Sequence, residues 1–137
     1  HIMMYMMPLD EHAVLVGDVR LGKALAPDAV ADPAFAQHAA RFDRVAAQLT
    51  ARGFAVPRIP VVVLPGAGSY VTYTNAVFDR DDRGKVVYLP TYRMLALDAF
   101  ATALYAQLGY RVVPIDVSTM YTLNGSLGCL VNVLARG

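Results

Sequence analysis

The sequence has one cysteine, three histidines and no tryptophan among its 137 residues. A single cysteine excludes a disulfide within the chain and suits a reducing compartment, so we expect a cytoplasmic protein. The histidines other than His1, at positions 12 and 38, fall in a predicted turn and on a predicted helix. They do not form a zinc-binding cluster, and we expect no metal and no other cofactor.

Charge is also scarce, at 17% of residues, and the twelve Lys and Arg nearly balance the eleven Asp and Glu. Without a strong field of one sign, neither nucleic acid nor an anionic membrane is an expected partner. Every apolar run is interrupted by Pro, Gly or charge well before the ~18 residues that a membrane span needs. The hydrophobic fraction is nevertheless 56%. A small domain has little interior in which to bury that excess, so we expect a homo-oligomer or contact with a missing N-terminal half.

The apolar patterns predict alternating strands and helices. A helix is expected from Asp32 and Pro33, as N-cap and first turn, to Gly53, with a second helix over 95–108. Its inner face is predicted to carry Phe100, Leu104 and Leu108. Strands are expected over 1–9, 13–17, 58–64, 70–78, 85–89 and 111–117, with a hairpin turn at 80–84 and a loop over 19–31.

This order repeats along the chain. Strand, strand, helix, strand occurs in a unit over 1–64 and again in a unit over 65–117, and 118–137 begins a third. A Gly-Ser pair lies shortly before Asn75 in the second unit, and another lies at the same spacing before Asn132 in the third. The two asparagines either line a pocket or satisfy the backbone of a neighbouring unit.

Cys129 follows two nearby glycines and precedes an apolar run that is typical of a strand. Two interpretations stay open. A thiolate is the strongest nucleophile among side chains near neutral pH, so Cys129 is a candidate catalytic residue. A free cysteine at the start of an apolar strand can equally be a small buried hydrophobe.

Several segments resemble the C-terminal part of agmatine deiminases and arginine-deiminase-like proteins, which have the pentein fold. The segments that carry the resemblance are 69–76, 86–90, 109–116 and Gly125-Ser126-Leu127-Gly128-Cys129. The resemblance implies an α+β fold of ββαβ units from a five-bladed α/β propeller, with about two units and one strand present. Cys129 falls on the family's nucleophile. The family has paired glycines and often a His before that Cys, whereas this chain has Asn124, Gly125 and Gly128.

The family's second motif, His-x-Asp before an apolar strand, aligns with His1-Ile2-Met3. His1 falls on the catalytic His, but Met3 falls on the Asp and cannot hold a guanidinium by a strong hydrogen bond. Either the site is altered, or residues 1–3 are a cloning scar. The family's other acid belongs to N-terminal blades that have no counterpart in this sequence.

The resemblance implies the C-terminal catalytic portion of a deiminase or amidinohydrolase, acting on arginine, agmatine or peptidyl-arginine. Cys129 would attack the guanidino carbon and His1 would serve as acid and base. Because both carboxylates are missing, we expect this chain alone to be inactive. The alternative is a non-catalytic pentein-like module that binds a partner or self-associates, since the fold alone does not fix the function.

Overall fold

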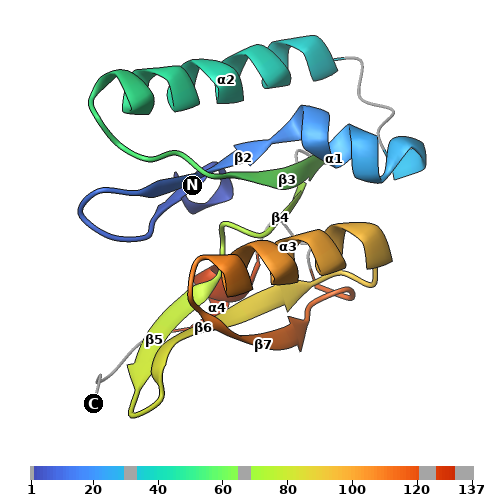
Figure 1. Ribbon diagram of the computed structural model, residues 1–137. Coiled ribbons are helices and arrows are strands. Elements are labelled where there is room, and N and C mark those ends of the chain that lie inside the picture. Colours follow the sequence, from blue (N-terminus) through green and yellow to red (C-terminus); the bar gives the residue numbers. More distant parts are fainter. Residues whose placement is uncertain (1, 30–33, 65–68, 121–125, 132–137) are drawn as a thin grey trace.

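The computed structural model describes residues 2–29, 34–64, 69–120 and 126–131 as a mixed α+β fold with two sheets (Figure 1). The first sheet has the order β1 (Met6–Pro8), β2 (Val14–Asp18), β3 (Arg58–Val63) and β4 (Tyr70–Thr72). The second has the order β5 (Val77–Asp81), β6 (Gly84–Thr91) and β7 (Arg111–Asp116). In both sheets an antiparallel pair is followed, after a helix, by a parallel strand.

Three longer helices position these sheets. Helix α2 (Phe35–Ala51) packs on β2, whereas α3 (Leu95–Gln107) contacts β3 of the first sheet and β6 and β7 of the second. Helix α1 (Val19–Leu25) packs closely on β3. Short 3-10 turns precede β1 (η1, Ile2–Met4) and follow α1 (η2, Pro27–Ala29). Among the described residues, no helix is long and apolar enough to span a bilayer.

The prediction of a loop over 19–31 is wrong for residues 19–25, which form α1. Asp18 caps this helix by accepting hydrogen bonds from the backbone N–H groups of Arg20 and Leu21 at 2.9 and 3.0 Å. Gly22 lies where α1 approaches β3 most closely, because a Cβ there would lie 2.0 Å from the carbonyl oxygen of Val61.

The predicted strand over 70–78 is divided in the structure. β4 ends at Thr72 in the first sheet, and β5 begins at Val77 in the second. The intervening bend is fully buried at Tyr73, Thr74 and Asn75. A continuous apolar pattern cannot reveal such a break, because the bend is as buried as the strands on either side of it.

The two helices predicted from apolar periodicity are present, but the start of α2 and the buried face of α3 differ from the prediction. Helix α2 begins at Phe35, while Asp32 and Pro33 lie outside the described residues. In α3 the fully buried positions are Leu97, Ala101 and Tyr105, not the predicted stripe of Phe100, Leu104 and Leu108, which is only partly buried. Ala101 fits a closely packed position, and Tyr105 satisfies its hydroxyl by donating to the Tyr73 carbonyl oxygen at 2.8 Å.

The core forms two clusters with β3 between them. Val61 and Val63 pack with Phe42 of α2, whereas Ile59 and Val62 pack with the residues around α3. β3 is therefore buried on both faces, which explains its continuous β-branched sequence.

Candidate functional site

Cys129 lies on α4 (Leu127–Leu130), a single helical turn, and its side chain is exposed. The prediction that Cys129 opens a strand is wrong for these residues, although 132–137 lie outside the described part of the chain. The alternative of a buried small hydrophobe does not fit either, because the thiol is accessible. A helix of four residues has little stability of its own, so α4 depends on contacts with neighbouring residues.

The first anchor of α4 is Ser126, the residue before it. The buried Tyr92 hydroxyl donates to the Thr72 carbonyl oxygen at 2.8 Å and lies 2.8 Å from the Ser126 Oγ. Because the single phenolic proton is used by Thr72, Ser126 donates to Tyr92. Burial raises the pKa of Tyr92 to about 12, so the hydroxyl keeps its proton and this chain of bonds persists at neutral pH.

The second anchor is Asn75, in the bend between β4 and β5. Its backbone oxygen accepts from the Gly128 N–H at 3.3 Å. Its side-chain Nδ2 donates to the Cys129 Sγ at 3.0 Å and to the Met4 Sδ at 3.3 Å. The structure thus places Asn75 against two sulfur atoms and not on a strand; its expected counterpart, Asn132, lies outside the described residues.

Gly128 is required by this packing. A Cβ at position 128 would lie 2.3 Å from the Asn75 Oδ1 and 2.6 Å from the Met3 Cε. Any side chain would push α4 away from the bend and from η1. Close approach of α4 to the bend is the physical reason for a glycine at position 128.

The structure brings Met3 beside α4, as its contact with the Gly128 position shows. The Thr74 hydroxyl donates to the Met3 carbonyl oxygen at 2.7 Å, which ties η1 to the same bend that holds Cys129. His1, the other residue that the resemblance singled out, lies outside the described residues.

Two cavities flank α4. One, of about 200 Å³, is lined by Met3, Met7, Ala76, Val77, Phe78, Gly128 and Val131. The other, of about 310 Å³, is lined by Val77, Tyr88, Ile115, Leu127 and Val131. Neither lining includes a charged side chain, so these walls alone would not grip a cation. Within the described part of the chain, no three His, Cys, Asp or Glu side chains are grouped so as to hold a metal ion.

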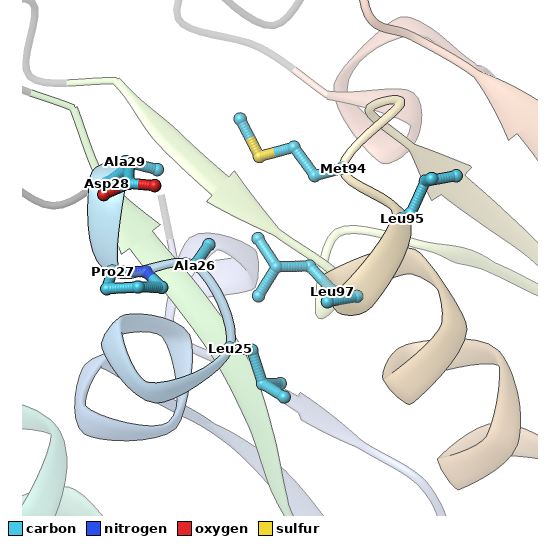
Figure 2. A pocket seen from close by; sticks show the side chains of 9 residues that line it. Leu25, Ala26, Pro27, Asp28, Ala29, Met94, Leu95 and Leu97 are labelled. Carbon is cyan, nitrogen blue, oxygen red and sulfur yellow. The ribbon is translucent and has the colours of Figure 1, made fainter.

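A third cavity, of about 330 Å³, lies between η2 and the start of α3 (Figure 2). Figure 2 shows Leu25 and Ala26 on one side and Met94 and Leu97 on the other. Among the described residues that line it, only Asp28 is ionisable. With no nucleophile or acid–base pair, this cavity offers apolar contact but no evident chemistry.

Asp98 fixes the loop between β6 and α3, and sequence reasoning missed it. Its carboxylate accepts from the Tyr73 hydroxyl at 2.7 Å and from the backbone N–H groups of Tyr92 and Met94 at 3.1 and 3.0 Å. Burial, and then the hydrogen bond to the Asp98 carboxylate, raise the pKa of Tyr73 well above its usual value. Asp98 holds the backbone of Tyr92, and Tyr92 in turn holds Ser126. The sequence offered one signal for this role: Asp98 lies in the first turn of a predicted helix, where acidic residues bind free backbone N–H groups.

Comparison with known proteins identifies the fold. No family model matches the sequence, and no curated protein matches it. The structure is similar to that of C. jejuni agmatine deiminase, with a TM-score of 0.61 and 18% sequence identity. The similarity covers 94% of this chain and 37% of the deiminase, so the chain spans little more than a third of that protein's length. At this identity the comparison establishes the fold alone: the chain has a pentein-like fold.

Proposed function

We propose that this chain is the catalytic C-terminal portion of a pentein-type enzyme that modifies a guanidino compound, with Cys129 as its nucleophile. The observation that carries the proposal is the structural likeness to agmatine deiminase over 94% of the chain. Two further observations support it. Cys129 is exposed on a helix that buried polar groups hold in place, and Met3, at the position of the family's catalytic Asp, lies beside that helix.

The proposed reaction begins with attack of the Cys129 thiolate on the central guanidino carbon. The C–N bond to one amino group then breaks, and that nitrogen leaves as ammonia after receiving a proton from an acid, for which His1 is the candidate. The S-amidino intermediate is attacked by water, which gives a proton back to the same base. The C–S bond breaks, and the thiolate is released together with a ureido product. No redox partner enters this balance.

A guanidinium also needs carboxylates along its N–H fork to fix its orientation. Since none of the described residues that line the two cavities beside α4 is charged, we propose that these acids come from a part of the protein outside this chain. Losing them removes charge-assisted bonds of about 1.5–3 kcal/mol each. The chain alone is therefore expected to release ammonia from agmatine, arginine or peptidyl-arginine no faster than the background.

Turnover assays test the proposal directly. Ammonia release should stay at background for the chain alone and for Met3→Asp, because one restored acid does not complete the clamp. Any activity obtained when the remaining part of the enzyme is supplied should disappear in Cys129→Ala, with the melting temperature nearly unchanged. Substantial turnover by the purified chain, or activity that survives in Cys129→Ala, would overturn this account.

A second candidate is a non-catalytic module that self-associates. The observation in its favour is the set of exposed apolar side chains, which includes Ile2, Leu95, Leu130 and Val131. Leu95, at the rim of the third cavity, is 85% exposed. This candidate predicts a dimer or larger assembly in sedimentation at micromolar concentration. A clean monomer that binds no apolar dye would count against it.

A further inference from the structure

The side-chain amide of Asn75 has an unusual set of contacts. It is fully buried, its Nδ2 faces the Cys129 Sγ and the Met4 Sδ, and its Oδ1 has no hydrogen-bond partner. A buried amide normally satisfies its oxygen before it contacts weak acceptors such as sulfur. The orientation of the Asn75 amide therefore needs a physical reason.

The contact between Nδ2 and the Cys129 sulfur supplies one. A neutral thiol has an S–H that an amide oxygen can accept, so it would favour the amide turned the other way, with its oxygen towards Cys129. A thiolate has no proton and accepts only, so it favours an N–H directed at the sulfur. The observed orientation, with Nδ2 3.0 Å from Sγ, places a donor where it stabilises a thiolate more than a neutral thiol, whose sulfur is only a weak acceptor.

We infer that Asn75 is a positioning residue for Cys129, whose amide N–H holds the sulfur in its reactive thiolate form while its backbone oxygen fixes the helix that carries it. The inference rests on the proposed role of Cys129 as nucleophile. The second hydrogen of Nδ2 is directed at the Met4 Sδ, which keeps the amide in this orientation. The close contact of Oδ1 with the Gly128 position limits the amide from the other side.

The substitutions Asn75→Asp and Asn75→Leu remove the donor with little change of size. Asn75→Asp also places negative charge beside the sulfur, which opposes the thiolate. Alkylation of Cys129 by iodoacetamide should slow by at least about tenfold at pH 7 in Asn75→Asp, and less in Asn75→Leu. In both variants the rise of rate with pH should move to higher pH.

Thr74→Val is the matched control. Thr74 is buried in the same bend and bonds to the Met3 carbonyl oxygen, but no bond links it to Cys129. Losing the bond to the Met3 carbonyl oxygen should lower the melting temperature without moving the pH profile of Cys129 alkylation. If all three variants slow alkylation equally and keep the wild-type profile, Asn75 is merely structural and the inference fails.

A second measurement needs no folded Asn75 variant. In the wild-type chain, the side-chain amide proton resonances of Asn75 should titrate together with Cys129, and the titration should vanish in Cys129→Ser. Resonances that stay constant while Cys129 ionises would overturn the inference. Failure of the proposed function is a separate result: it is the absence of ammonia release, with the remaining part of the enzyme supplied, by a chain whose Cys129 reacts fast and responds to the Asn75 variants as described.

Discussion

The first three strands of one sheet, β1-β2-β3, have the same order and directions as β5-β6-β7 of the other, but the parallel strands β3 and β7 differ in how far they are buried. In β3 every residue from Ile59 to Val63 is buried, whereas no residue of β7 is. β3 has α1 and α3 packed against it and lies between β2 and β4. β7 pairs with β6 alone among the described strands and contacts α3. The same topology therefore gives a closed core in one half and an open sheet in the other, and α4 lies beside the open sheet.

The largest expected effect comes from the closest contact in the closed half. Gly22→Ala would place a methyl group 2.0 Å from the carbonyl oxygen of Val61, so α1 must move away from β3. We expect a loss of about 3 kcal/mol or more in unfolding free energy, at the upper end of overpacking costs. Gly109→Ala is the control, because its positive φ of 83° costs only about 1 kcal/mol and no atom lies near its Cβ. Urea denaturation of both variants measures the difference, and equal losses would contradict the comparison.

Isoleucine to alanine substitutions extend the comparison to side chains of equal size. Ile59 in β3 is fully buried, while Ile115 in β7 is only partly buried. Ile59→Ala should lower the unfolding free energy by about 2–5 kcal/mol, and Ile115→Ala by less than half of that. Chemical denaturation at one temperature is sufficient. A larger effect at Ile115 would mean that β7 is covered in solution, as self-association would produce.

Most of the succession of strands and helices along the chain could be predicted from the sequence because it rests on local patterns. The β-branched run of β3 and the helix that ends before Gly109 follow from apolar spacing and from turn residues. The site could be predicted less well. The Ser126 hydroxyl bonds to the hydroxyl of Tyr92, 34 residues earlier in the chain, and no local pattern specifies such a pair. The backbone N–H of Tyr92 bonds in turn to Asp98. The resemblance named Cys129 and Met3, but it gave no reason for Asn75 to face the sulfur.

The first residues of β3 and β7 offer a comparison of charge. Arg58 is about three-quarters buried and donates to the Gly17 carbonyl oxygen and to Asp43, at 3.0 and 3.1 Å. Arg111 pairs with Asp81, and its side chain is 48% exposed against 26% for Arg58. Arg58→Met should therefore lower the unfolding free energy by about 1–2 kcal/mol after solvent screening. Arg111→Met should leave the melting temperature almost unchanged, and thermal unfolding in low and high salt would separate the two.

The smallest expected effect is on the stability of the fold at low pH. Hydrogen bonds from Ser118, and then Arg93, lower the pKa of Asp116 to about 2. Because the folded pKa lies below the unfolded one, this stabilisation is fully present above about pH 4 and is lost as the pH falls towards 2. Asp116→Asn should flatten the decline of stability between these pH values. An unchanged slope in the variant would show that Asp116 does not take part in acid unfolding.

The reactivity of Cys129 tests the central claim most directly. The rate of its alkylation by iodoacetamide in the intact chain at about pH 6 is compared with that of glutathione under the same conditions. A nucleophile held as a thiolate by Asn75 should react at least about tenfold faster than the free peptide thiol. A rate equal to or below that of glutathione would contradict the account and leave Cys129 as an exposed thiol without a catalytic role.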